Sequence, residues 1–244
     1  MMMRTAIVTG GGKRVGRLLT ERLLGDGWTV VAHVHRDADD VPAGAHKVVA
    51  DLASAECART IMTACPNPPQ LLVNNAARFA ADDLMGFDPA EFAAHMTVNV
   101  QAPALLIRAF AEAGVGDRLI VNILDAKLAA PNPDFLSYTL SKAALAALTE
   151  LSARALAGQG IRVNAIAPAL MLLSAGQSSE NFEDAHRLNP LRQGVTPDHV
   201  WQALRFLLDS AVTTGEVLTL DGGQRFFGLP RDVQFLELQP HGAS

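Results

Sequence analysis

The stretch Thr5-Ala-Ile-Val-Thr-Gly-Gly-Gly-Lys-Arg-Val-Gly16 decides how this chain begins to fold. Its apolar start predicts a short strand, and the glycines that follow permit a tight turn. Apolar residues then recur at helical spacing as far as Gly25 and Gly27. A glycine-rich turn that joins a strand to a helix can receive a phosphate at the helix N-terminus, although a plain turn remains the alternative. The expected dinucleotide contacts here are Gly10, Lys13, Arg14 and Val15.

Strand and helix patterns alternate along the rest of the chain. Strand patterns recur at 29–34, 46–50, 70–73, 118–123, 161–166 and 217–220, and helical patterns at about 54–65, 89–113 and 135–157. This alternation predicts a Rossmann-type α/β fold, in which helices cover both faces of a doubly wound parallel sheet. Ligands bind such sheets at the carboxyl ends of the strands. We expect a single domain over 1–244, with a substrate lid at about 169–196 and a tail after 223.

The composition favours a globular protein with a substantial core, because 49% of the 244 residues are hydrophobic and 18% are charged. The net charge of −5 and the lack of a basic stretch argue against a nucleic-acid or anionic-membrane partner. No apolar run reaches the roughly 18 residues that span a bilayer. The N-terminus leads straight into a strand without a signal peptide, so we expect the cytoplasm. Cys57 and Cys65 fit neither a disulfide framework nor a zinc site, and no metal is expected.

Tyr138 and Lys142 lie four residues apart in a helical pattern, which places them on one face of the helix. The Lys142 ammonium is expected beside the phenol, where it favours the ionised form. At about 4 Å and an effective dielectric constant near 20, this attraction is of order 4 kcal/mol, enough to lower a pKa by a few units. The spacing by itself usually means a solvated helix face. Together with the glycine-rich turn, it indicates a nicotinamide-dependent enzyme that reduces a carbonyl or an imine.

The end of the second strand, His33-Val-His-Arg36, bears on the choice of cofactor. An enzyme that binds NAD often has an acid there for the ribose hydroxyls. Arg36 would instead pair with a 2′-phosphate, with added charge from Lys13 or Arg14, so we expect NADPH. Asp37 would repel that phosphate if it pointed into the same pocket, which leaves room for both cofactors. An exposed strand end is the alternative interpretation of Arg36.

Further motifs follow in an order that resembles the short-chain dehydrogenase/reductase family over about residues 5–223. These motifs are the glycine-rich turn, Asp51-Leu52, Asn74-Asn-Ala76, Asn99, Tyr138-x-x-x-Lys142 and Asn164-Ala-Ile-Ala-Pro168. The resemblance implies a homotetramer assembled through the long helices. It also implies cofactor contacts from Asp51, Leu52, Asn75, Ala76 and Pro168, and a proton-relay water held by Asn99. The alternatives are a helix N-cap for Asp51, a turn residue for Asn75 and a helix-bend residue for Asn99.

Two departures from the usual family pattern involve charge. Asp125 stands 13 residues before Tyr138, where most members have a serine, and Arg14 replaces the middle glycine of the turn. With His35-Arg36 and with Phe79, three residues after Ala76, these positions resemble pteridine reductases and bacterial dihydromonapterin reductases. That resemblance implies that Phe79 and the nicotinamide sandwich a pterin. Core packing is the alternative for Phe79, and a strand-end cap the alternative for Asp125.

The chemistry of a dihydropterin agrees with an acid at position 125. Its C6–N5 imine takes a hydride on carbon and a proton on nitrogen, so an acid at Asp125 near N5 is useful. An ionised Asp125 would raise the pKa of Tyr138 and oppose the effect of Lys142, so the three groups should titrate as one coupled system. Arg14 would contact the pterin oxygen or a cofactor phosphate, and Leu170 would form a wall of the slot. The alternatives are an exposed position in the first helical turn for Arg14 and ordinary lid packing for Leu170.

We therefore expect NADPH-dependent reduction of a dihydropterin such as dihydromonapterin, dihydrobiopterin or dihydrofolate. A reductase of 3-oxoacyl or small ketone substrates remains an alternative. The other alternative is a non-catalytic NADPH-binding protein.

Overall fold

Seven parallel strands form one sheet in the computed structural model, which describes residues 4–114, 116–173 and 179–236. Their order is β3-β2-β1-β4-β5-β6-β7. The strands are β1 (Thr5–Val8), β2 (Thr29–Val34), β3 (His46–Val49), β4 (Leu71–Asn74), β5 (Arg118–Ile123), β6 (Ile161–Pro168) and β7 (Val217–Leu220). The order reverses between β1 and β4, and such a reversal opens a ligand crevice at the carboxyl ends of the strands. The expected α/β fold is confirmed.

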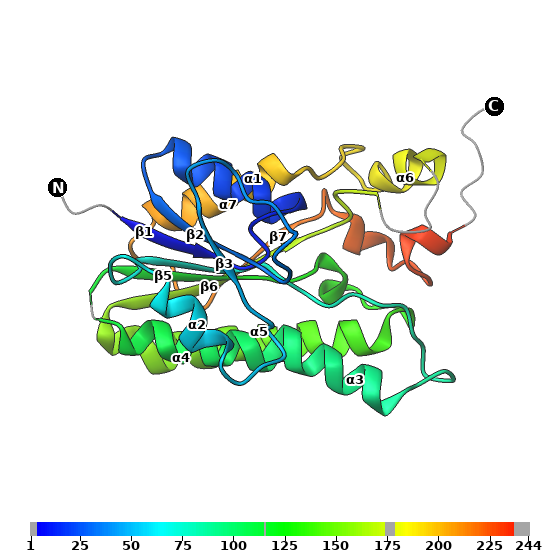
Figure 1. Ribbon diagram of the computed structural model, residues 1–244. Helices are drawn as coiled ribbons and strands as arrows, with labels where there is room; N and C mark the ends of the chain where they lie inside the picture. The colour runs from blue at the N-terminus through cyan, green and yellow to red at the C-terminus, as the bar shows by residue number, and fades with distance from the viewer. Residues whose placement is uncertain (1–3, 115, 174–178, 237–244) are drawn as a thin grey trace.

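Helices cover both faces of the sheet (Figure 1). One face carries α1 (Arg14–Gly25) and α7 (Pro197–Asp209), and the other carries α2 (Cys57–Thr63), α4 (Ala102–Glu112) and α5 (Leu136–Leu156). Two further short helices, α3 (Pro89–Met96) and α6 (Ser179–His186), complete the α-helices of the described residues. No helix in the described ranges is long and apolar enough to cross a membrane.

Strand register explains why the core is continuous across the sheet. Val31, Ile7, Leu72, Ile120 and Val163 stand side by side on five neighbouring strands, and each is fully buried. This row packs against α2, α4 and α5, while the alternate residues of β1 face α1 and α7. Burial of each such side chain contributes about 1.5–3 kcal/mol. The sheet is therefore a rigid base for the loops at its carboxyl edge.

Helix α7 was not among the expected elements, although its signals are present in the sequence. Thr196 and His199 form a capping box, and Pro197 occupies the first helical turn. Val200, Leu204 and Leu207 then recur on one buried face. The helix covers the sheet beside α1, so it completes the core on that side.

The helix expected over 89–113 is interrupted in its middle. Helix α3 ends at Met96, a π-helical turn covers Thr97–Gln101, and α4 continues from Ala102. A π-turn holds one residue more than an α-turn and is frequent at functional sites. Here it contains Asn99, whose side chain is buried.

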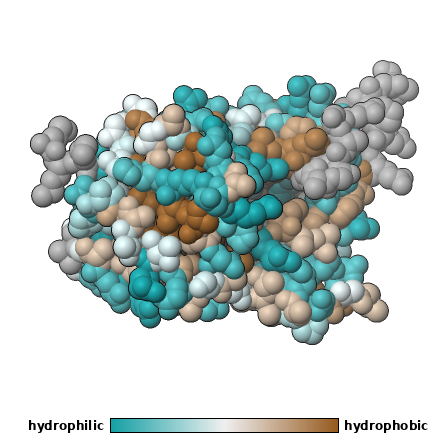
Figure 2. Space-filling model, viewed as in Figure 1, coloured by the Kyte–Doolittle hydropathy of each residue, from teal (hydrophilic) through white to brown (hydrophobic). Residues whose placement is uncertain are grey.

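The last part of the chain is more ordered than its weak periodicity indicates. Short 3₁₀ helices cover Gln224–Phe227 and Val233–Phe235. The region expected to form a lid, 169–196, contains α6. Residues 174–178 of this region lie outside the described ranges. On the side of the molecule seen in Figure 2, hydrophilic residues predominate and hydrophobic ones gather in a few patches.

Candidate active site

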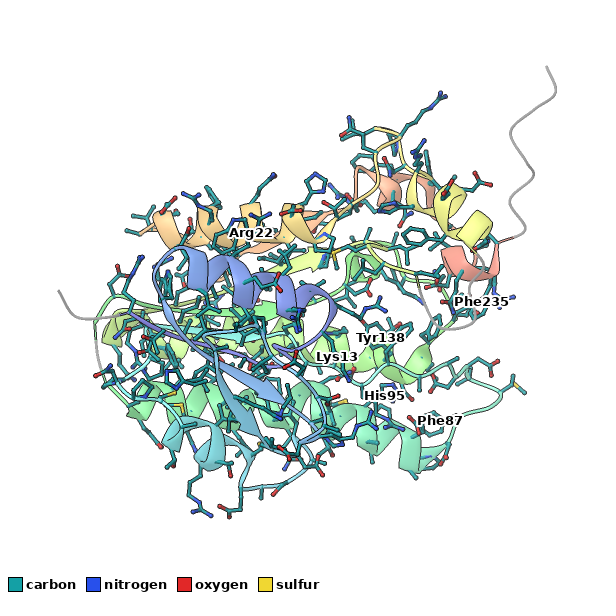
Figure 3. The ribbon with its side chains drawn as sticks, turned by 45° about the horizontal axis from the view of Figure 1, so that its top comes forward. Lys13, Arg22, Phe87, His95, Tyr138 and Phe235 are labelled. Atoms are coloured by element: carbon teal, nitrogen blue, oxygen red, sulfur yellow. The ribbon has the colours of Figure 1, made fainter. Side chains whose placement is uncertain are left out.

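A cavity of about 740 Å³ opens at the carboxyl edge of the sheet. Its size lies within the range of small-molecule sites. Figure 3 shows Lys13 and Tyr138 near the middle of the view, and both line the cavity. The expected site residues that line it are Gly10, Lys13, Arg14, Val15, Asn75, Ala76, Phe79, Asp125, Tyr138, Lys142, Pro168 and Leu170.

His33 holds the glycine-rich turn in place. Its Nδ1 accepts a hydrogen bond from the Gly10 N–H at 3.2 Å, so Nε2 carries the proton and donates to the Ala50 carbonyl at 3.0 Å. Burial lowers the pKa of His33, in agreement with a neutral ring. His33 therefore has a structural role, because it links the glycine-rich turn to the residue after β3.

The N-terminus of α1 fits a bound anion. Lys13 precedes the helix without a side-chain cap, and the first turn contains no acidic residue. The uncapped N–H groups and the helix dipole favour a negative charge at this end. The residues present therefore fit the pyrophosphate of a dinucleotide.

Replacing Gly16 by alanine should weaken NADPH binding by more than about tenfold, or 1.4 kcal/mol. A Cβ at this position would lie 2.1 Å from the Gly10 carbonyl oxygen and 2.6 Å from Asn75 Nδ2, so the turn must open. Calorimetric titration with NADPH measures the effect. Gly25→Ala is the matched control, because nothing lies within 4 Å of a Cβ at the far end of the same helix. Equal affinities in the two variants would contradict the prediction.

Thr9 fixes the segment that follows β4. Its hydroxyl oxygen accepts hydrogen bonds from the N–H groups of Asn75 at 2.9 Å and Ala76 at 3.0 Å. The Asn75 side chain returns a bond to the Thr9 carbonyl at 2.9 Å. Two expected cofactor contacts are thus held against the glycine-rich turn.

At the end of β2, the carboxylate that lies beside the cationic residues is not the one expected from the sequence. Asp37 lies 3.2 Å from Lys47 and its side chain is 95% exposed. Asp39 instead forms an ion pair with Lys13 and accepts from the Arg36 N–H at 3.2 Å. The hydrogen bond from Lys13 holds the pKa of Asp39 below its usual value. The carboxylate that faces the cationic residues is therefore Asp39, two positions beyond the one expected.

Some expected cofactor residues lie outside the cavity lining. His35 and Arg36 follow β2 at its exposed end, and the His35 ring lies 3.9 Å from Asp51. Asp51 accepts from the Ala53 N–H at 2.9 Å in a turn before α2, and the N-cap of α2 is Glu56, so the helix-cap alternative for Asp51 is wrong. Leu52 is buried in the core against α2 and α4. Cofactor contacts from these four residues remain predictions.

Asn99 also lies outside the cavity lining. Its amide hydrogens bond the Arg78 carbonyl at 3.0 Å and the Ser141 hydroxyl at 2.9 Å, and its oxygen accepts from the Arg78 N–H at 2.7 Å. The Asn99 side chain therefore ties the segment before Phe79 to α5. The relay-water role remains a prediction.

Helix α3 supports the same segment from its other side. Arg78 and Glu91 form a bidentate pair at 2.6 and 2.7 Å. The Ala80 N–H donates to His95 Nε2 at 3.3 Å. Both neighbours of Phe79 are thus anchored, and the ring between them is 51% exposed.

The Phe79 ring forms an aromatic wall of the cavity. It stacks on Phe135 with centroids 4.5 Å apart and an interplanar angle of 23°. It meets Tyr138 edge-on, with centroids 4.7 Å apart. Core packing, the alternative for Phe79, is therefore wrong. An exposed ring in this position can stack on a flat ligand.

Asp125, Tyr138 and Lys142 come together where β5 meets α5. The Tyr138 hydroxyl donates to Asp125 Oδ2 at 3.0 Å, and Asp125 Oδ1 accepts from the Lys127 N–H at 2.9 Å. Asp125 is thus both a cap of the next turn and the partner of the phenol. Lys142 Nζ donates to the Ile123 carbonyl at 2.6 Å and lies 5.6 Å from the centre of the Tyr138 ring.

Burial dominates the electrostatics of this group. Burial, with a further effect from Asp125, raises the pKa of Tyr138 well above its usual value. The expected attraction of Lys142 does not determine the direction of the shift. Burial is the largest cause, and Asp125 adds to it as expected. Burial also lowers the pKa of Lys142 to about 8.

Asp125 is shifted toward its protonated form. Burial raises the pKa of its carboxyl, and the bonds from Lys127 and Tyr138 and the charge of Lys142 only partly oppose this. Asp125 and Tyr138 therefore form a pair that retains protons. Such a pair can deliver a proton to a reacting atom in the cavity.

Arg14 connects the glycine-rich turn to the segment after β6. Its guanidinium donates to the carbonyls of Leu172 at 3.4 Å and Leu173 at 3.2 Å. Leu170 lines the cavity nearby, as expected. The contacts of Arg14 with a pterin or a phosphate remain predictions.

Several residues of the cavity were not expected from the sequence. They include Lys127, Phe135, Leu229, Asp232, Val233 and Gln234. The last four follow the final strand, where the sequence pattern shows only a turn-forming Pro230. Long-range contacts, and not local sequence, bring this segment to the site.

Comparisons with known proteins agree with this geometry. Residues 15–225 match the family described as enoyl-(acyl carrier protein) reductase. The chain is 30% identical to pteridine reductase 1 of Leishmania tarentolae, over 89% of this chain and 95% of the relative. It is 32% identical to L-xylulose reductase of Homo sapiens, over 90% of this chain and 96% of the relative. The solved structure of FolM alternative dihydrofolate reductase 1 from Brucella suis in complex with NADP is 34% identical, with a TM-score of 0.84, and covers 91% of this chain and 95% of its own.

Proposed function

The chain belongs to the short-chain dehydrogenase/reductase family, and on this premise we propose that it reduces a dihydropterin to the tetrahydro form with NADPH. Its relatives are reductases, which argues against a non-catalytic protein. The observation that carries the pterin proposal is the Tyr138–Asp125 hydrogen bond of 3.0 Å beside the exposed Phe79 ring. Similarity to pteridine reductase 1 supports the same substrate class.

The cofactor is NADP(H), as in the Brucella suis relative. Gly10, Val15 and the uncapped N-terminus of α1 would hold its pyrophosphate, and Asn75, Ala76 and Pro168 would contact it along the cavity. When bound, NADPH supplies the hydride for C6 of the substrate. Lys142 would hold the nicotinamide ribose.

The protein residues then supply orientation and the proton. Phe79 stacks on the flat ring and limits its position. Asp125, whose carboxyl is buried and shifted toward the protonated form, faces N5 with Tyr138. Because the two groups share a hydrogen bond, the proton lost to N5 can be replaced through the phenol. Arg14 and Leu170 would border the ring.

A reductase of 3-oxoacyl or small ketone substrates is the second candidate, since the Tyr138–Lys142 pair and the similarity to L-xylulose reductase suit it equally. Turnover distinguishes the two. NADPH oxidation should be followed with dihydromonapterin, dihydrobiopterin, dihydrofolate, an acetoacetyl thioester and a simple ketone. Dihydropterins should give the highest kcat/KM. Ready reduction of the ketones without turnover of any dihydropterin would exclude the pterin function.

Replacing Asp39 by asparagine should tighten NADPH binding by about two- to fivefold. The carboxylate pairs with Lys13 beside Arg36, where it competes with a 2′-phosphate for the cations. NADH lacks that phosphate, so its binding should change little. Calorimetric titration with NADPH and with NADH measures the ratio of the two dissociation constants. Asp37→Asn, at an exposed carboxylate, is the control. Weaker NADPH binding in Asp39→Asn would refute the competition.

We further propose that residues 169–196 act as a substrate lid. The segment begins at the cavity, and Arg14 attaches it to the glycine-rich turn through Leu172 and Leu173. The proposed assembly is a homotetramer through the long helices, for which α5 offers the exposed Leu140 and Leu151. The proposed location is the cytoplasm.

A further inference from the structure

Residues 229–235, here called the C-terminal strap, form one wall of the cavity. Leu229, Asp232, Val233 and Gln234 line it together with the reactive group Asp125, Tyr138 and Lys142. In Figure 3, Phe235 of the strap lies at the right of the view, and Tyr138 lies nearer the middle. The strap thus reaches the site from a part of the chain far from the family motifs.

Asp134, just before α5, anchors the strap. Arg231 Nε lies 2.9 Å from each Asp134 carboxylate oxygen, and the Asp232 N–H donates to Asp134 Oδ2 at 2.7 Å. Burial alone would raise the pKa of Asp134, but the bonds from Arg231 and Asp232 hold it below its usual value. The anchor is therefore ionised and paired.

Aromatic packing fixes the other end of the strap. The Phe235 ring is parallel to Phe135 within 15°, with centroids 5.6 Å apart. Phe135 in turn stacks on Phe79. The strap therefore supports the ring that we expect to stack on the substrate.

Lys127 joins the strap to the reactive pair. Its backbone N–H donates to Asp125 Oδ1 at 2.9 Å, and its ammonium lies 3.4 Å from Asp232 Oδ2. The same ammonium bonds the Asp134 carbonyl. The side chain of Lys127 is only 8% exposed and that of Asp232 is 22% exposed, so water screens this ion pair less than one at the surface.

We propose that Asp232 is a positioning residue for the Asp125–Tyr138 pair, acting through Lys127 and through its own negative charge. The assignment rests on the proposed function for the roles of Asp125 and Tyr138, but not on the identity of the substrate. Asp232 keeps the loop at Asp125 in place and biases the pair toward the protonated state needed for proton donation.

The surrounding charges define the sign of this effect. The reactive pair faces Lys142 from α5, Lys127 from the loop after β5 and Asp232 from the strap. The Asp221–Arg225 ion pair also lines the cavity. A negative charge at Asp232 adds to the effect of burial and raises the pKa of both Asp125 and Tyr138. Removing it should therefore lower both values.

The chain offers a direct readout, because Tyr138 is its only tyrosine. The ultraviolet absorbance of the phenolate, or the ring signal of isotope-labelled tyrosine, then titrates one known group without added cofactor or substrate. Asp232→Asn keeps an acceptor for Lys127 and removes the charge. We expect the Tyr138 titration to move to lower pH in this variant and to return toward the wild-type position in Asp232→Glu.

Two comparisons set the scale of this shift. Asp125→Asn removes the direct partner of the phenol and should give a larger shift in the same direction. Asp37→Asn removes an exposed charge at the end of β2 and should give none. Circular dichroism confirms that each variant is folded over the titrated range. A Tyr138 titration in Asp232→Asn that coincides with that of Asp37→Asn would overturn the proposal.

Activity adds a second measurement that separates this proposal from the choice of substrate. Reduction requires a protonated donor, so activity falls as the pH rises through the pKa of the pair. This fall is the alkaline limb of the pH profile of kcat/KM. In Asp232→Asn the limb should move to lower pH with whichever substrate in the panel is reduced. If only ketones are reduced and the limb still moves, the pterin function fails and the role of Asp232 stands. An unmoved limb with a dihydropterin would leave the function intact and refute the role of Asp232.

Discussion

Replacing Tyr138 by phenylalanine should lower the turnover of a dihydropterin by about 10²- to 10⁴-fold, the usual contribution of a positioned acid. The change removes the hydroxyl that donates to Asp125 and leaves the ring in its edge-on contact with Phe79. Binding of NADPH should be nearly unchanged, because the phenol oxygen is the only group lost. Steady-state turnover and a calorimetric titration on the same preparation measure the two effects.

The control for this variant is Glu150→Gln, at an exposed position further along α5. It should retain turnover close to that of the wild type. A Tyr138→Phe protein that kept turnover within a few-fold of the wild type would show that Asp125 delivers the proton without the phenol. The proton pathway would then have to be assigned to the carboxylate alone.

Replacing Asp125 by serine should separate the two candidate functions. Reduction of dihydropterins should fall by about a hundredfold or more, because the acid facing N5 is lost. Reduction of a ketone should be retained or rise, since serine restores the neutral hydrogen-bonding group found in most family members. The measurement is the ratio of kcat/KM for a dihydropterin to that for a ketone.

Asp125→Asn provides the matched comparison, because it keeps an acceptor for the Lys127 N–H and removes only the acid. Its pterin activity should fall like that of Asp125→Ser, which distinguishes loss of the proton from loss of the loop geometry. If both variants reduced dihydropterins as well as the wild type, Asp125 would have no part in the chemistry.

The sequence was sufficient for the features that local patterns encode. The apolar runs predicted β2 at Thr29–Val34 and β5 at Arg118–Ile123 with the bounds that the structure shows. The glycine-rich turn, Asp125 and the Tyr138–Lys142 pair were expected at one site, and all of them line one cavity. Each of these features depends on side-chain spacing or turn chemistry, which is visible in a short stretch of chain.

The remaining features depend on contacts between distant segments. The position of Asp232 depends on Arg231 meeting Asp134, 97 residues away, and no local pattern indicates that meeting. The direction of the Tyr138 pKa shift depends on the fold for a related reason. Spacing along the helix places Lys142 near the phenol, but burial, which depends on the whole fold, determines the net effect.

The π-helical turn at Thr97–Gln101 sets the rotational phase between α3 and α4. If the same residues instead formed a regular α-helix, with about 100° per residue, α3 would rotate by roughly that angle relative to α4. Glu91 and His95 would then turn away from Arg78 and Ala80, the two residues that flank Phe79. The depth and tilt of the aromatic wall are therefore encoded by a single surplus residue in a helix that does not line the cavity.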